Sequence, residues 1–159
     1  MRLRRILIGS SLLLMLMSVG GFLYLKSLGV FSGQAVYADA TGAIGGYDPV
    51  AYFAQGQAVP GEPQFHHVWN GAKWLFSSAE NRDAFAADPA KYAPQFGGYC
   101  AYAVSEGYTA NSDPTVWSVV DDRLYLNYNE AVAEQWSAEQ VVRIQTAQKN
   151  WPEMRPAGP

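Results

Sequence analysis

The sequence predicts an α+β fold: a small compact domain with short antiparallel hairpins and several short helices, preceded by one N-terminal membrane helix. Asn70-Gly71 and Asp121-Asp122 each separate two short runs rich in aromatic and β-branched residues, as in a tight β-hairpin. Two capping motifs, Ser77 to Glu80 and Ser137 to Gln140, mark helix starts. An apolar run of twenty residues near the N-terminus is long enough to cross a bilayer.

The apolar run spans residues 6–25 and follows three arginines within the first five residues. At a rise of about 1.5 Å per residue it extends about 30 Å, whereas a cleaved signal peptide usually has a shorter apolar core. The best cleavage motif, Ala38-Asp39-Ala40, lies far beyond the run. We therefore expect an uncleaved signal anchor, with a secreted protein as the alternative if the signal is cleaved. The positive-inside rule places the remainder on the extracytoplasmic, periplasmic side of the inner membrane, as a single-pass protein.

Four segments follow from this interpretation: a signal anchor (1–27), a flexible tether rich in Gly, Ser and Ala (28–46), one domain (47–152) and a frayed tail (153–159). Local signals then place the elements of the domain. Asp or Ser before a helix marks its start, Pro marks a first turn or a stop, and Asn-Gly marks a turn. The predicted elements are a helix over 48–53, strands over 65–69 and 72–76, helices over 77–87 and 88–93, a tight loop over 95–98, strands over 116–120 and 123–127, and helices over 130–136 and 137–151.

The charge of the predicted exported part excludes a nucleic-acid groove. Four of the eleven basic residues lie in the anchor, so seven Lys and Arg remain against fourteen Asp and Glu, a net charge of −7. A groove for nucleic acid needs clustered Lys and Arg, and anionic lipid surfaces are disfavoured for the same reason. Cations or a basic protein partner fit the sign better.

The first hairpin places its two histidines on different faces. The expected cross-strand pairs are Trp69–Ala72, His67–Trp74 and Phe65–Phe76. His67 then shares a nearly all-aromatic face, which we expect to be the core, while His66 shares a wetter face with Lys73 and Leu75. An inward histidine is either a hydrogen-bonded core residue or a group that binds a ligand or carries a proton.

Cys100 is the only cysteine and follows Gly97-Gly98, where the backbone can approach another segment closely. It cannot form an intramolecular disulfide, so it is a buried inert thiol, a metal ligand or a reactive group. If the loop presents it beside His67, the pair suits Cu(I) or Zn(II). Two protein ligands suffice for Cu(I) but are few for structural zinc. Tyr99, Tyr102 and Asp113 are possible additional oxygen ligands.

Five motifs between residues 46 and 101 resemble the YHS-domain proteins, and in particular their exported bacterial branch. The motifs are G-Y-D-P-V-A-Y-F, H-x-W-N-G, F-S-S-A-E-N-R-D-A-F, D-P-A-K-Y-A-P and G-G-Y-C-A. The resemblance runs from about Gly46 to Trp151. Because other YHS domains occur in copper- and heavy-metal-transporting ATPases, it implies a small metal-associated module. Ser77 stands where metal-binding relatives tend to carry a cysteine, so fewer thiolates are available here.

These observations predict a binding module rather than an enzyme. The chain has no G-x-S-x-G, H-E-x-x-H, P-loop or dinucleotide fingerprint, although a thiol-dependent activity of Cys100 is an alternative. We expect an extracytoplasmic module that binds a soft metal, with copper favoured, through Cys100 and His67. The alternative is a non-catalytic accessory or interaction domain of an envelope membrane-protein complex. Its expected contacts are Trp117, Tyr125 and Tyr128.

Overall fold

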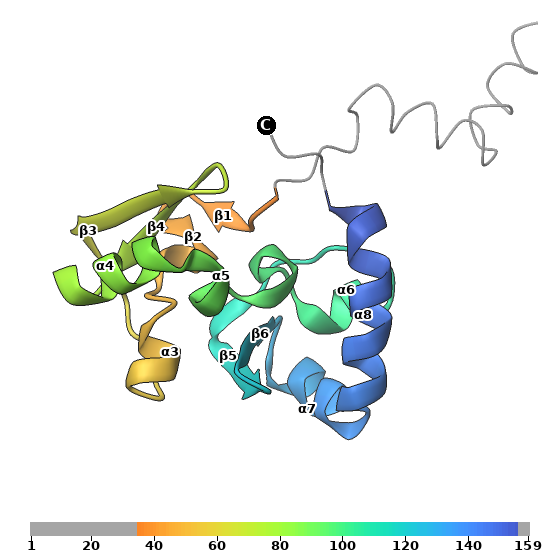
Figure 1. Cartoon of the computed structure of the whole chain (residues 1–159). Helices are drawn as coiled ribbons and strands as arrows, with labels where there is room; N and C mark the ends of the chain where they lie inside the picture. The colour runs from red at the N-terminus through yellow and green to blue at the C-terminus, as the bar shows by residue number, and fades with distance from the viewer. Residues whose placement is uncertain (1–34, 156–159) are drawn as a thin grey trace, which may run out of the picture. The chain divides into compact units, whose positions relative to one another are not determined.

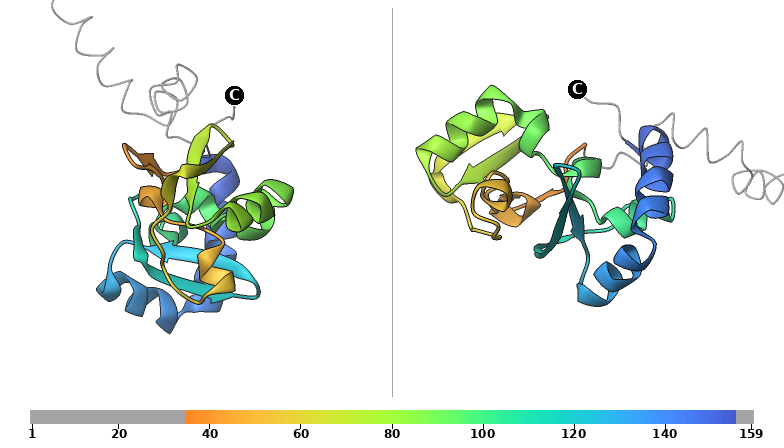
Figure 2. Two further views of the ribbon diagram at one scale, coloured as in Figure 1. Left: turned by 90° about the vertical axis from the view of Figure 1, so that its left-hand side faces the viewer. Right: turned by 60° about the horizontal axis from the view of Figure 1, so that its bottom comes forward.

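Two antiparallel hairpins, each followed by helices, make up most of the part of the chain that the structure describes. The structure is a computed structural model, and it describes residues 35–155 (Figures 1 and 2). The predicted anchor, residues 6–25, lies outside the described residues, as do the first part of the predicted tether and residues 156–159. Within residues 35–155 no helix is both long enough and apolar enough to cross a membrane.

Short strands and short helices succeed one another along the described residues, which confirms the predicted α+β class. Each of the three described sheets is an antiparallel pair of strands. In chain order the elements are β1 (Ala38–Asp39), β2 (Gly42–Ala43), η1 (Ile44–Gly46), α3 (Ala51–Ala54), β3 (Glu62–Trp69), β4 (Ala72–Phe76), α4 (Ala79–Ala87), α5 (Pro89–Tyr92), η2 (Gln95–Gly98), α6 (Ala101–Ser105), β5 (Asp113–Val120), β6 (Arg123–Asn127), α7 (Glu130–Ala138) and α8 (Gln140–Met154).

Strand β6 lies between two hydrophobic clusters in the described domain. Side chains alternate across a strand, and here Leu124 and Leu126 pack into a cluster with Trp74, Phe76 and the first hairpin. Tyr125 points the other way, into a cluster formed mainly by η2, α6, α7 and α8. All three side chains are at most 2% exposed. Because it is buried on both faces, β6 joins the two parts of the domain that Figure 1 shows on either side of it.

The first hairpin has the predicted turn, and its register agrees near the turn. Trp69 pairs with Ala72 and His67 pairs with Trp74, as expected. The predicted pair of Phe65 with Phe76 is wrong: Phe76 pairs with Glu62, because a β-bulge interrupts β3 between Glu62 and His66. A period-two pattern cannot reveal such an insertion, which shifts the register beyond it.

The predicted tether differs from the structure over its second half, where the chain packs into the domain. Val36, Ala43 and Ile44 are buried in the first cluster. β2 lies against β4 and covers Leu75, which is 6% exposed although it was expected on the wetter face of the hairpin. A Cβ atom on Gly97 would collide with the carbonyl oxygen of Ala35, so only glycine permits this close approach.

Asp48 is fully buried and its carboxylate accepts five hydrogen bonds. The Oδ1 atom accepts from the backbone N–H groups of Val50 (2.8 Å) and Ala51 (3.3 Å), at the start of α3. The Oδ2 atom accepts from the backbone N–H and hydroxyl of Ser77 (2.8 and 2.7 Å) and from Nδ2 of Asn81 (2.7 Å). The predicted helix over 48–53 with Asp48 as its N-cap differs from α3, which begins at Ala51 with Val50 at the N-cap. Asp48 lies in the turn before α3 and links its first N–H groups to the loop and helix after β4.

Two helix starts differ from the predicted capping motifs. Ser78, not Ser77, caps α4, because its hydroxyl oxygen accepts from the N–H of Asn81 (3.1 Å) while the hydroxyl of Ser77 donates to Asp48. The motif at Ser137 does not start a helix. α7 runs through it to Ala138, and α8 begins at Gln140 without a side-chain cap.

Two helices in the C-terminal half go beyond the prediction. α6, directly after Cys100, was not predicted, and four of its five residues are buried. α8 continues through Pro152 to Met154, so the first residues of the predicted frayed tail are helical. Pro152 has no N–H to donate, but beyond it the N–H of Arg155 still donates to the carbonyl of Trp151 (2.7 Å), so helical bonding resumes after the proline.

The side chain of Arg143 links α8 to α6. Its guanidinium donates to Glu106 (2.7 Å) and Glu139 (2.9 Å) and lies 4.2 Å from the centre of the Tyr102 ring. The hydrogen bond to Glu106 is the main cause that raises the pKa of Arg143 above its ordinary value. The C-terminal helix is thus held by charge as well as by packing.

Removing the Asp48 carboxylate should destabilise the fold. We expect Asp48→Ala to lower the free energy of unfolding by about 3 kcal/mol, because buried donors at two helix starts lose their acceptor. Urea unfolding of the full-length chain, followed by tryptophan fluorescence, measures this. Asp39→Ala is the matched control: its exposed carboxylate accepts two hydrogen bonds from Thr41 and should contribute less than about 1 kcal/mol. Equal losses in the two variants would contradict the role of Asp48.

Candidate functional site

Cys100 is a buried thiol at the start of α6, with 1% of its surface exposed. Its backbone N–H donates to the carbonyl of Ala110 (3.0 Å), and its Sγ lies 3.8 Å from Oδ1 of Asn127, to which it donates. The same Oδ1 accepts the N–H of Tyr102 (3.2 Å). Reactive cysteines are partly exposed in electropositive surroundings. The position of Cys100 instead matches the predicted alternative of a packed core thiol.

His67 lies on the inward face of β3, as predicted, and His66 is exposed. The His67 ring makes an edge-to-face contact with Phe85, with ring centres 6.2 Å apart. Nδ1 of His66 lies 3.0 Å from the carbonyl oxygen of Pro63. The aromatic surroundings of His67 therefore come from β4 and α4.

The structure does not bring Cys100 and His67 together. β3, which carries His67, lies at the left of the described domain in Figure 1, and α6, which follows Cys100, lies in its right-hand half. The backbone of Cys100 pairs with Leu126 of β6, whereas the ring of His67 contacts Phe85 in the cluster of the first hairpin. One ion held by both side chains does not fit this arrangement.

The additional predicted ligands also have other contacts. The Tyr99 ring packs against Tyr37 and Trp151, and the Tyr102 ring lies beneath Arg143. Asp113 accepts two hydrogen bonds from Thr115. No group of three or more His, Cys, Asp or Glu side chains that could hold a metal ion occurs within residues 35–155.

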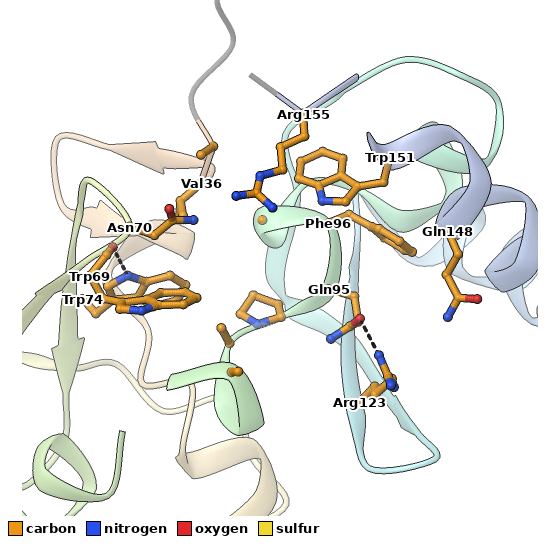
Figure 3. Close-up of a pocket in the computed structure, with 15 residues that line it drawn as sticks. Val36, Trp69, Asn70, Trp74, Gln95, Phe96, Arg123, Gln148, Trp151 and Arg155 are labelled. Atoms are coloured by element: carbon orange, nitrogen blue, oxygen red, sulfur yellow. Dashed lines mark hydrogen bonds between the residues drawn. The ribbon is translucent and has the colours of Figure 1, made fainter. Parts of the chain in front are cut away.

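A cleft of about 710 Å³ is the candidate site that the structure adds (Figure 3). Its walls come from five separate segments. The turn of the first hairpin contributes Trp69, Asn70 and Trp74, and α8 with the residue after it contributes Gln148, Trp151 and Arg155. The remaining lining residues belong to the N-terminal segment, to α5 and η2, and to β6: Ala35, Val36, Ala90, Ala93, Pro94, Gln95, Phe96, Gly97 and Arg123.

Ring contacts hold the aromatic walls of the cleft in place. Nε1 of Trp74 donates to the carbonyl of Trp69 (3.1 Å), and the two indoles lie 6.0 Å apart between ring centres. On the opposite wall the rings of Phe96 and Trp151 are 6.1 Å apart. Phe96 has a φ of +56°, a left-handed conformation that is uncommon for a bulky residue and persists only where the surroundings enforce it. These walls are therefore formed before any ligand enters.

The charged groups of the cleft are arginines. Arg123 donates from Nη1 to Oε1 of Gln95 (3.2 Å), and Arg155 extends from the end of α8 toward the space between Asn70 and Phe96 (Figure 3). No Asp or Glu is among the residues that line the cleft. Among the described residues neither arginine forms an ion pair, in contrast to Arg82 and Arg143.

Sequence reasoning missed this cleft because its lining residues lie far apart in the chain. Trp69 and Trp74 belong to the hairpin face that we expected to be the core, and no local pattern connects them with Trp151, Arg123 or Arg155. The predicted partner contacts also change in the structure. Tyr125 is 2% exposed and belongs to the core, whereas Tyr128 is 55% exposed.

Comparison with known proteins identifies one family over part of the chain. Residues 50–96 match the family model of the YHS domain. The match covers α3 to the start of η2, a shorter range than the motif resemblance indicates. No curated protein and no solved structure matches the chain.

The separation of Cys100 and His67 has a measurable consequence for copper binding. We expect His67→Ala to leave the Cu(I) affinity of the full-length protein unchanged, whatever the effect of Cys100→Ser, because the structure does not bring the two side chains together. A competition titration against a chromophoric Cu(I) chelator measures both variants, with exposed His66→Ala as the control. One tight site lost in both Cys100→Ser and His67→Ala, but not in His66→Ala, would contradict the arrangement.

Proposed function

Because this chain carries a YHS domain over residues 50–96, we propose that the protein is an extracytoplasmic YHS-type binding module that takes a ligand into the cleft. Residues 6–25 anchor it in the inner membrane in this proposal. The cleft itself is the observation that supports the binding role. Eight of its fifteen lining residues belong to the YHS segment. Its volume of about 710 Å³ lies within the usual range for small-molecule sites, about 300 to 1,000 Å³.

The polar side chains in the cleft favour binding over catalysis. They are the amides of Asn70, Gln95 and Gln148 and the guanidinium groups of Arg123 and Arg155. Amides and guanidinium groups donate hydrogen bonds and hold charge, but they are neither nucleophiles nor proton acceptors at neutral pH. We therefore propose a non-catalytic role for this site.

Soft-metal binding is a second candidate, with copper favoured over zinc. The YHS domain is associated with metal handling, and Cys100 is the cysteine within residues 35–155. In this candidate the metal site does not use the predicted Cys/His pair, because Cys100 contacts Asn127 whereas His67 contacts Phe85. The Cu(I) titration described above tests this candidate directly.

An accessory role in an envelope membrane-protein complex is the alternative to ligand binding. Exposed side chains outside the cleft support a contact surface, with Tyr128, Val141 and Val142 between 55% and 69% exposed. Contiguous exposed apolar side chains are typical of protein interfaces, and Val141 and Val142 are neighbours in α8. In this alternative the partner is another envelope protein.

Blocking the cleft should abolish ligand binding. We expect aromatic fragments that bind the full-length protein, detected by saturation-transfer NMR, to lose binding in Ala90→Trp, because the new indole fills the cleft from α5. Trp151→Leu, which removes one aromatic wall, should weaken the same fragments. Tyr128→Leu is the control, since Tyr128 is exposed outside the cleft. Fragments that bind all these variants equally would refute a binding function at the cleft.

The proposed location has its own test. An alkaline phosphatase reporter, which is active only outside the cytoplasm, should be active when fused after the full chain and inactive when residues 2–26 are deleted. A β-galactosidase fusion, which is active only in the cytoplasm, should show the opposite pattern. Activity of the β-galactosidase fusion to the full chain would place the domain in the cytoplasm and refute the extracytoplasmic assignment.

A further inference from the structure

We infer that the cleft binds a small organic anion with a flat aromatic body, such as an aromatic carboxylate or sulfonate. This inference rests on the proposed function and names the ligand class of the same site. Three properties of the cleft carry it: the sign of its charge, the planarity of its walls and the hydrogen-bonding groups between them.

The charge of the cleft is opposite to that of the domain around it. Fourteen Asp and Glu give the chain after residue 26 a net charge of −7, yet none of them is among the residues that line the cleft. Two of the seven arginines and lysines after residue 26 do line it, Arg123 and Arg155. A concave site lined by one sign of charge concentrates the field there. The cleft therefore favours an anion although the domain as a whole repels one.

The two arginines are available to a ligand. Arg82 pairs with Asp83, and Arg143 pairs with Glu106 and Glu139, so these guanidinium groups already have carboxylate partners. Within residues 35–155 neither Arg123 nor Arg155 has such a partner. A guanidinium group binds a carboxylate, sulfonate or phosphate through two parallel hydrogen bonds. Gln95 already orients Arg123 through its side-chain oxygen.

The walls suit a flat ring rather than a flexible chain. Trp69 and Trp74 lie on the hairpin side and Phe96 and Trp151 on the helix side, with the cleft between them (Figure 3). Aromatic rings attract one another in stacked and edge-to-face arrangements, beyond the effect of buried area. The amides of Asn70, Gln95 and Gln148 can bond polar substituents on the ring. A ring that carries one acidic group uses all three kinds of lining group.

Other ligand classes fit less well. A nucleic acid would need a track of basic residues, and the cleft has two. A metal cation would need carboxylate, thiolate or imidazole donors, and none lines the cleft. A neutral aromatic compound would leave both guanidinium groups without a charged partner, so it should bind more weakly than the anion of the same shape.

The test compares two compounds of nearly equal shape, 2-naphthoate and the neutral 2-naphthylmethanol. Each is titrated into the full-length protein in a non-ionic detergent, and binding is measured by saturation-transfer NMR. Three proteins are compared: the natural sequence, the cleft variant Arg123→Gln/Arg155→Gln and the control Arg82→Gln/Lys149→Gln. The control removes the same two charges from positions outside the cleft. Circular dichroism establishes that all three are folded.

We expect the cleft variant to bind 2-naphthoate at least about tenfold more weakly, because it loses charge-assisted hydrogen bonds, and the control to change less than about twofold. Added salt should weaken binding to the natural sequence. The neutral compound should bind more weakly than 2-naphthoate to the natural sequence, and equally to all three proteins. Equal binding of 2-naphthoate to the cleft variant, or neutral binding as tight as anion binding, would overturn the ligand class.

The same experiment separates this inference from the proposed function. If the neutral compound binds as tightly as the anion and Ala90→Trp abolishes both, the cleft is a binding site and only the anion preference is wrong. If neither compound binds the natural sequence, the inference is overturned, and the fragment screen decides whether the cleft binds anything else. If 2-naphthoate binds the cleft variant and Ala90→Trp as tightly as it binds the natural sequence, both the inference and the proposed binding function of the cleft are overturned.

Discussion

The buried carboxylate of Asp48 links the segments that form the first half of the domain. One oxygen accepts from the backbone at the start of α3, and the other accepts from Ser77 and Asn81 after β4. A buried carboxylate is tolerated only when its oxygens are hydrogen-bonded, and each of these donors would itself be costly to leave without an acceptor. The hairpin β3–β4 lies between these two segments in the chain. Its position, and with it one wall of the cleft, therefore depends on this contact.

Strand β6 has the corresponding role between the two halves. Because it is buried on both faces, Leu124 and Leu126 pack with the first hairpin while Tyr125 packs with α6, α7 and α8. The YHS segment and the C-terminal helices therefore share one strand rather than meeting as independent bodies. The cleft is open where Arg123, at the start of β6, lies near η2 and the end of α8. The wall on the hairpin side is therefore supported by the first hydrophobic cluster, and the wall on the helix side is supported by the second.

This arrangement also explains why His67 and Cys100, the two predicted metal ligands, do not lie in one site. His67 lies on β3 in the aromatic packing of the first half, and Cys100 lies at the start of α6, beside Leu126 of β6. Each is well packed in its own surroundings. The aromatic and arginine side chains that do converge are of types that bind ligands by stacking and by charge. The chemistry of the cleft is therefore that of recognition.

The sequence by itself determined what local interactions control. Asn70-Gly71 specified the first hairpin and the pairing of His67 with Trp74, and the motifs indicated the YHS domain whose family model matches residues 50–96. Only the tertiary structure decided the bulge in β3, the burial of Val36 and Ile44, and the separation of Cys100 from His67. The cleft belongs to this second group. Turn and capping signals act over a few residues, whereas Trp69, Arg123 and Trp151 become neighbours only after both cores have packed, so no local pattern in the sequence encodes their contact.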